Sequence, residues 1–160
     1  VGASQIFVTG FGARDRQKLE LAESFGADLA INTESDSAVD AVLAATDGKG
    51  VDVVVDTTPH ALQPIHDALR IVRPGGTIVL AGMKGNAVDG FPTDEIAMRR
   101  LTIKGVRAVD TANFKRAVAL IETSPDLVAQ LHTHNFSLED AAKAIELLAN
   151  GDGIAITLRT

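Results

Sequence analysis

Residues 51–82, VDVVVDTTPHALQPIHDALRIVRPGGTIVLAG, contain the pattern that decides the fold. The near-continuous apolar run at 51–55 is rich in valine, and such runs predict a strand buried on both faces of a sheet. Residues 62–72 carry apolar side chains at helical spacing, and the Pro-Gly-Gly turn at 74–76 ends that helix. Residues 77–82 form a second apolar run. The segment therefore predicts a strand, a helix and a strand, the repeating unit of a parallel sheet.

The same alternation continues on both sides of this segment. Apolar runs and helical spacing predict further strands at residues 6–8, 29–31 and 101–106, and helices at 19–25 and 39–43. Gly26 can end the first of these helices in the left-handed conformation, and Ser37 with Asp40 forms a capping box for the second. Strands that alternate with helices predict an α/β fold on a doubly wound parallel sheet. A barrel is excluded because it typically takes about 250 residues.

The second half of the chain departs from this rhythm. We expect a loop, a short helix, a longer helix, an extended segment, another helix and a last strand at residues 84–91, 92–100, 114–121, 131–136, 137–148 and 154–158. The last three elements do not continue the strand–helix alternation, and they indicate a segment that returns toward another domain.

Composition narrows the class of protein. The 160 residues include 21 acidic and 15 basic side chains, for a net charge of -6, and 46% of them are hydrophobic. This apolar fraction excludes a disordered chain, and the acidic balance argues against a protein that coats nucleic acid or an anionic membrane. No run approaches a membrane span, and the first residues show no secretory signal. The chain has no cysteine, so it holds no disulfide or thiolate zinc ligand. We expect a soluble, cytoplasmic protein.

The glycines after the first predicted strand allow two interpretations. The run Gly10-Phe11-Gly12-Ala13-Arg14-Asp15 approximates the phosphate-binding Gly-x-Gly-x-x-Gly loop, but Asp15 replaces the third glycine. Alternatively, Gly10 ends a second strand, where dinucleotide folds normally carry an acidic residue that binds the adenosine ribose 2′-hydroxyl. The lack of that acid, with Arg14 and Arg16 just beyond, favours NADP over NAD because guanidinium groups bind phosphate. In the competing interpretation both arginines are solvated residues of a first helical turn.

Seven stretches follow one another in a fairly specific order and spacing: GASQIFVTG at 2–10, KLELA at 18–22, FGAD at 25–28, GVDVVVD at 50–56, ALRIVRPGGTIV at 68–79, LTIKG at 101–105 and FSLEDAAKAI at 136–145. Together they resemble the later part of zinc-type, medium-chain alcohol and polyol dehydrogenases. In that family the zinc ligands, the first Rossmann strand and its glycine loop all lie upstream of the position matched by Val1. The resemblance therefore implies a Rossmann-like sheet that lacks its first strand and glycine loop.

This resemblance also implies a division into domains. We expect an incomplete dinucleotide-binding domain at residues 1–128 and, at 129–160, a return segment toward a catalytic domain that is not in this chain. In the sheet order 3-2-1-4-5-6 the absent strand is central. Open edges beside residues 6–8 and 51–55 are then expected, and open edges favour pairing with another chain, such as a second copy.

The resemblance implies a nicotinamide cofactor, NADP or NAD, and contacts to it from the ends of predicted strands. These contacts are Thr57 and Thr58 for the ribose and pyrophosphate, Ala81, Gly82 and Met83 for the nicotinamide amide, and Val106, Arg107 and Ala108 in a loop that closes on the nicotinamide ring. Pro59 departs from the family, which commonly has glycine there. The implied reaction of the longer enzyme is hydride transfer between an alcohol and the nicotinamide. The zinc of that enzyme would lie outside this chain, so the chain alone is expected to be inactive.

Other interpretations stay open on the sequence. The chain could be a stand-alone nucleotide-binding or interaction module that assembles through its open sheet, or part of a zinc-free quinone reductase of the same superfamily. Methyltransferases share the pattern at residues 68–76, but residues 10–15 of this sequence do not supply the acidic Gly-x-Gly loop that a methyltransferase needs. His132 and His134 could face one side of a strand, yet no third zinc ligand lies nearby in the sequence. Asp56 could touch a cofactor or cap the turn that follows it.

Overall fold

The computed structural model describes residues 2–85 and 88–160, so residues 86–87 of the predicted loop at 84–91 lie outside the described residues. The chain divides into two compact units, which we call the central unit (Ser37–Ala108) and the terminal unit (Val1–Asp36 with Val109–Thr160). No helix among the described residues is long and apolar enough to cross a membrane.

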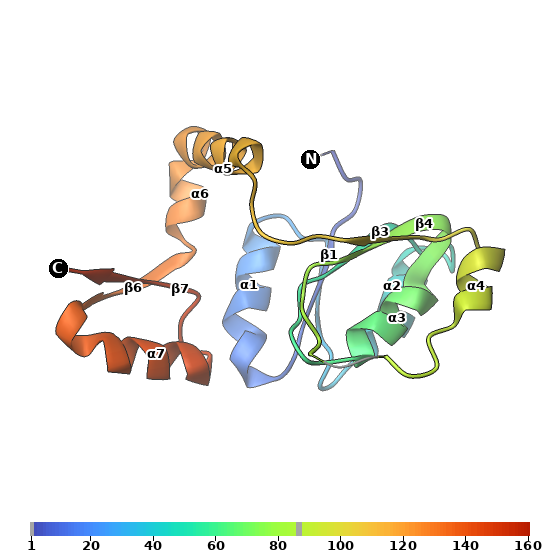
Figure 1. Cartoon of the computed structure of the whole chain (residues 1–160), viewed down its shortest axis with the longest axis horizontal. Helices are drawn as coiled ribbons and strands as arrows, with labels where there is room; N and C mark the ends of the chain where they lie inside the picture. The colour runs from blue at the N-terminus through green and yellow to red at the C-terminus, as the bar shows by residue number, and fades with distance from the viewer. Residues whose placement is uncertain (1, 86–87) are drawn as a thin grey trace. The chain divides into compact units, whose positions relative to one another are not determined.

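The central unit is a parallel sheet with helices. Its strands are β3 (Val51–Asp56), β4 (Val72–Leu80) and β5 (Thr102–Gly105), hydrogen-bonded in the order β3-β4-β5, and its helices are α2 (Ala38–Ala45), α3 (Gln63–Ile71) and α4 (Thr93–Met98). Helix α3 packs against β3 and β4 (Figure 1). Ser37 caps α2 by accepting a hydrogen bond from the backbone N–H of Asp40 at 3.2 Å, which confirms the predicted capping box.

The core of the central unit lies between α3 and the sheet. Its buried members are Ile65, Ala68 and Leu69 of α3 and Val72 and Ile78 of β4, and partly buried Val54 of β3 packs against them. Ile78 is only 1% exposed. This side of the sheet holds the three strands and the helix together, because apolar area removed from water is the main stabilising contribution.

The prediction that residues 51–55 are buried on both faces is wrong. Val53 and Val55 are 54% and 58% exposed, whereas Val54 packs on the core. Successive side chains of a strand point to opposite faces, so the face opposite Val54 presents Val53 and Val55 to solvent. A valine run alone does not distinguish a strand covered on one face from a strand covered on both.

The boundary between α3 and β4 also differs from the prediction. The helix ends at Ile71, and Val72 already pairs with Val51 in the sheet. The register shifts between Val51 and Val53, as in a β-bulge. Gly76 permits this irregularity, because a Cβ there would lie 2.6 Å from Val72 Cγ2 and 2.9 Å from the Asp52 carbonyl oxygen. The Pro-Gly-Gly turn therefore lies inside the strand, where it accompanies the bulge, and not between helix and strand.

The terminal unit contains two small parallel sheets. Its elements are β1 (Phe7–Gly10), the 3-10 helix η1 (Ala13–Asp15), α1 (Arg16–Ser24), β2 (Leu29–Asn32), α5 (Thr111–Thr123), α6 (Pro125–Ala129), β6 (His132–Ser137), the 3-10 helix η2 (Leu138–Asp140), α7 (Ala141–Asn150) and β7 (Ala155–Arg159). Strand β1 pairs with β2, and β6 pairs with β7. Gly26 follows α1 with a φ of 93°, as predicted. Helix α6 is an addition to the predicted elements, and Pro125 at its start fits the first turn of a helix.

The strand orders confirm the predicted fold class. Removing the first strand from the order 3-2-1-4-5-6 leaves a pair and a triplet of parallel strands. In the described part of the chain, β1-β2 is that pair and β3-β4-β5 is that triplet. The protein is therefore an α/β protein with an incomplete, Rossmann-like arrangement of parallel strands.

Candidate functional site

The carboxyl end of β3 is tied to the carboxyl end of β4 through the backbone of Asp56. Its carbonyl oxygen accepts hydrogen bonds from the N–H groups of Ala81, at 2.8 Å, and Gly82, at 2.9 Å. Its side-chain Oδ1 accepts the N–H of Thr58 at 3.0 Å and also the Thr58 hydroxyl. Asp56 thus caps the turn after β3 and is 4% exposed. The two strand ends form one continuous surface at the edge where doubly wound sheets bind ligands.

Gly82 is the point of closest approach between these strand ends. A Cβ at this position would lie 2.2 Å from the Thr58 carbonyl oxygen and 2.7 Å from the Thr57 carbonyl carbon. Both are backbone atoms, which cannot rotate away as a side chain could. Glycine is therefore required here for space.

A buried ion pair underlies the same strand ends. Lys84 Nζ lies 2.7 Å from Asp56 Oδ2, and the two side chains are only 8% and 2% exposed. Nζ also donates to the Thr58 carbonyl oxygen at 2.6 Å and to its hydroxyl at 3.2 Å. Burial alone would raise the pKa of Asp56, but the hydrogen bonds from Lys84 and Thr58 hold that pKa below its usual value. Asp56 is therefore an ionised carboxylate whose Oδ1 accepts two hydrogen bonds from Thr58 and whose Oδ2 faces the Lys84 ammonium group.

The turn after β5 lies at the same edge of the sheet. The N–H of Val106 donates to the Leu80 carbonyl oxygen at 3.0 Å, which places Val106 beside the end of β4. Ala108 has a φ of 58°. His60 has a φ of 63°, and its N–H donates to the Met83 carbonyl oxygen at 3.1 Å. Asp47 and Arg100, elsewhere in the central unit, also have positive φ, so this conformation alone does not mark the site.

The structure thus gathers one group of the sequence-predicted residues in the central unit. We call this group the strand-end cluster; its members are Thr57, Thr58, Ala81, Gly82, Met83, Val106 and Arg107. It combines backbone groups and hydroxyls with exposed apolar side chains, as nucleotide sites do. Met83 is 77% exposed and Val106 is 44% exposed.

The other predicted residues lie in the terminal unit, around the end of β1. A Cβ at Gly10 would lie 2.8 Å from Asp15 Cβ and 3.1 Å from Leu19 Cγ. Any larger side chain, including the acid that commonly ends this strand, would collide with the start of α1. The glycine is therefore explained by close packing between strand and helix.

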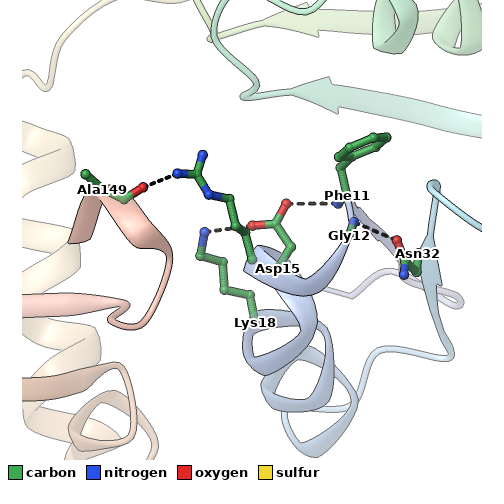
Figure 2. Close-up of polar contacts among 7 residues, drawn as sticks. Phe11, Gly12, Asp15, Lys18, Asn32 and Ala149 are labelled. Carbon is green, nitrogen blue, oxygen red and sulfur yellow. Dashed lines mark hydrogen bonds and ion pairs between the residues drawn. The ribbon is translucent and has the colours of Figure 1, made fainter. Parts of the chain in front are cut away.

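The backbone N–H groups after Gly10 donate hydrogen bonds to side chains of the chain itself. The N–H of Phe11 donates to Asp15 Oδ2 at 2.9 Å, and the N–H of Gly12 donates to Asn32 Oδ1 at 2.8 Å (Figure 2). A phosphate-binding loop needs such N–H groups directed at the ligand. The interpretation of residues 10–15 as a phosphate loop therefore has no support from this geometry, and Gly10 at the end of a paired strand fits the alternative.

The charged side chains beyond Gly10 all have partners. Burial would raise the pKa of Asp15, but hydrogen bonds from Lys18 and from the Phe11 N–H hold it below its usual value. Lys18 Nζ lies 2.8 Å from Asp15 Oδ1. Arg14 donates to the carbonyl oxygen of Ala149 near the end of α7 (Figure 2). Arg16 lies 4.0 Å from Glu20, with both side chains largely exposed. Each contact uses only part of a guanidinium group, which has five N–H donors.

The two histidines of β6 have local partners. His132 Nε2 lies 2.9 Å from the Thr157 hydroxyl, and the His134 ring stacks on Phe136 with centroids 6.2 Å apart. The sheet register shifts between them, so they do not follow simple strand alternation. Within residues 2–85 and 88–160, no group of three or more His, Asp or Glu side chains could hold a metal ion.

The strand order and the hydrogen bonds between the strand ends define a Rossmann-like α/β protein. The chain belongs to the zinc-binding dehydrogenase family, whose model matches residues 1–123. It is 35% identical over 156 residues to the "Probable alcohol dehydrogenase" of Mycobacterium tuberculosis, covering 96% of this chain and 42% of that protein. It is 31% identical over 157 residues to the "Probable D-xylulose reductase A" of Aspergillus clavatus, with coverage of 96% and 42%.

A solved structure agrees with these relatives. The alcohol dehydrogenase of Thermotoga maritima is 26% identical to this chain and superposes with a TM-score of 0.86, covering 98% of this chain and 43% of that one. The chain therefore spans less than half the length of the relatives that it matches. The resemblance drawn from the sequence is confirmed. The domain boundary at residue 128 and the cofactor contacts stay predictions.

Proposed function

We propose that this chain is the cofactor-binding portion of a longer NAD(P)-dependent alcohol or polyol dehydrogenase. The observation that carries this proposal is the strand-end cluster, where Gly82 brings two backbone segments into contact at the ligand edge of the sheet. The relatives named above are alcohol dehydrogenases and a D-xylulose reductase, and the family resemblance implies hydride transfer between an alcohol and a nicotinamide ring. When bound, the dinucleotide supplies the hydride chemistry, and the protein supplies binding and orientation.

The residues present fit a dinucleotide. In the proposed site, Thr57 and Thr58 would bind the ribose and pyrophosphate through backbone groups and hydroxyls, and the backbone of Ala81, Gly82 and Met83 would hold the nicotinamide amide. Val106 and Arg107 would cover the ring from the end of β5. A side chain at Gly82 would fill the space between the strand ends, so the site depends on its absence.

The proposal assigns zinc to the part of the longer enzyme outside this chain. The described residues offer no group of three metal ligands, and the sequence has no cysteine. We therefore propose that zinc ligands and the proton relay belong to the rest of a longer subunit, and that this chain alone does not turn over an alcohol. The stand-alone module, the methyltransferase and the zinc-free quinone reductase are the alternatives that this proposal replaces.

The unpaired edge of the central sheet supports a longer subunit. Among the described strands β3 pairs only with β4, so its other backbone edge has no partner there. A strand added to this edge would complete the order 3-2-1-4-5-6. We also propose a homo-oligomer, because the same open edge could pair with a second copy of the chain.

NADP is the proposed cofactor in preference to NAD. Gly10 carries no acid, and the Asp15 carboxylate nearby is already neutralised by Lys18 at 2.8 Å. The present contacts of Arg16 and Arg14 are an exposed ion pair and a bond to a neutral carbonyl. A phosphate is a stronger partner for guanidinium than either, so a 2′-phosphate can recruit both arginines.

The test is to titrate the chain with NADPH and with NADH. We expect NADPH to bind about tenfold tighter, and Arg14→Ala combined with Arg16→Ala to remove most of that difference. The chain has no Trp and no Tyr, so cofactor fluorescence can be followed without protein emission. Arg70→Ala with Arg116→Ala, two exposed arginines, is the control of equal charge change. Equal affinities in the unmutated chain would contradict the preference, and tighter NADH binding would point to Asp15 as an acceptor for the 2′-hydroxyl.

A further inference from the structure

We propose that Lys84 is a positioning residue for the dinucleotide, holding the Thr57–Thr58 segment against Gly82 from beneath the strand ends. The inference rests on the proposed function, since it concerns the same strand-end cluster. Lys84 lies outside the contacts that the family resemblance implies. Its ammonium group forms an ion pair with Asp56 and donates hydrogen bonds to Thr58.

The geometry of the ammonium group favours this role. Nζ donates hydrogen bonds to the Thr58 carbonyl oxygen at 2.6 Å and to the Thr58 hydroxyl at 3.2 Å, and it lies 2.7 Å from Asp56 Oδ2 in an ion pair. All three contacts hold one turn. The Thr58 carbonyl is therefore fixed in direction as well as in place.

The atom that Lys84 fixes is also the atom closest to Gly82. The Thr58 carbonyl oxygen would lie 2.2 Å from a Cβ at position 82, so the two segments are in contact through it. A small rotation of the Thr58–Pro59 peptide, which carries this oxygen, would change the spacing between the strand ends. Binding sites lose affinity when a contact group moves by about 1 Å. Lys84 therefore controls the spacing that the cofactor meets.

Stability alone does not account for a buried lysine at this position. A buried ion pair seldom stabilises a fold more than apolar residues of the same volume would, because both charges lose their hydration. Lys84 and Asp56 are nonetheless 8% and 2% exposed at the ligand edge. Their directional hydrogen bonds give the turn one conformation, which apolar packing would not.

The experiment separates positioning from stability with a charge-balanced double variant. Lys84→Met leaves Asp56 buried without its cation, so it should lower both the unfolding midpoint and the affinity for NADPH. Lys84→Met with Asp56→Asn removes both charges and keeps an oxygen for Thr58. We expect this double variant to recover most of the midpoint, yet to bind NADPH about tenfold more weakly than the unmutated chain. Lys84→Arg, which keeps the charge, should bind better than Lys84→Met.

Lys49→Met is the control, because Lys49 is in the same unit with its side chain 77% exposed and pairs with Asp47. Lys49→Met should leave the unfolding midpoint and the affinity for NADPH unchanged. NADPH binding by the double variant within twofold of the unmutated chain would overturn the proposal and leave the pair a structural one.

A second readout keeps this inference distinct from the proposed function. If the unmutated chain binds no NADPH, the proposed function fails, but backbone amide resonances still report on positioning. Thr57, Thr58 and Gly82 should shift in Lys84→Met and in the double variant, and should not shift in Lys49→Met. Unchanged resonances at these three positions in the double variant would overturn the positioning role whatever the cofactor result.

Discussion

Replacing Gly82 with alanine should destabilise the central unit by about 3 kcal/mol, the upper end of the usual cost of overpacking, and abolish NADPH binding. The added Cβ would lie 2.2 Å from the Thr58 carbonyl oxygen and 2.6 Å from its carbonyl carbon. Real Cβ atoms do not approach so closely, and the obstructing atoms are backbone. The ends of β3 and β4 would have to separate, which also breaks the hydrogen bond of 2.9 Å from the Gly82 N–H to Asp56. Urea unfolding and NADPH fluorescence measure the two effects.

Gly105→Ala is the matched control for this variant. Gly105 ends β5 in the same unit, and a Cβ there would meet nothing within 4 Å. Its backbone is also outside the left-handed region, so alanine adds no strain. We expect a change in unfolding free energy within about 0.5 kcal/mol. Equal losses from Gly82→Ala and Gly105→Ala would show that the contact between the strand ends is not what requires glycine.

Ile78→Ala should have a comparable effect through a different cause. Ile78 is 1% exposed at the centre of β4 and packs with Ile65, Leu69 and Val72. Truncation leaves a cavity that the surrounding strand and helix cannot fill, and such changes cost about 3 to 4 kcal/mol. The unfolding transition of the central unit, followed by circular dichroism in urea, should move to lower denaturant with little change in slope.

Val55→Ala provides the comparison for Ile78→Ala. Val55 lies on the next strand but is 58% exposed, so truncation removes little buried area. We expect a loss below about 1 kcal/mol. A loss as large as that of Ile78→Ala would mean that Val55 is covered in solution, for example by a second copy of the chain. Analytical ultracentrifugation of the unmutated chain would then identify that association.

The elements that follow local rules could be predicted from the sequence. Gly26 ends α1 and Ser37 caps α2 because helix ends depend on residues within a few positions of one another. Strands β3 and β4 could also be predicted, from a valine run and an apolar run, because strand propensity and run length do not depend on distant residues. The placement of the strand-end cluster follows from the fold, because parallel strands end on one edge.

Features that depend on distant partners could not be predicted. Lys84 lies in a loop with no distinguishing pattern, and its role emerges only when the fold brings it to Asp56. Arg14 looks like a cofactor contact in the sequence, and its bond to Ala149 depends on a helix near the other end of the chain. The exposure of Val53 and the early start of β4 at Val72 were missed for the same reason. Neighbouring elements determine the exposure of Val53 and the start of β4, and the residues themselves do not.

The central claim is that the strand-end cluster binds a nicotinamide dinucleotide. The most direct measurement is a titration of the 15N-labelled chain with NADPH, followed by the backbone amide resonances. We expect NADPH to cause saturable shifts at Thr57, Thr58, Gly82, Met83 and Val106. Nicotinamide riboside, which lacks the adenosine half, should cause no shifts at Arg14 or Arg16 at the same concentration. Saturable shifts confined to residues outside this cluster, or no shifts at millimolar NADPH, would contradict the account.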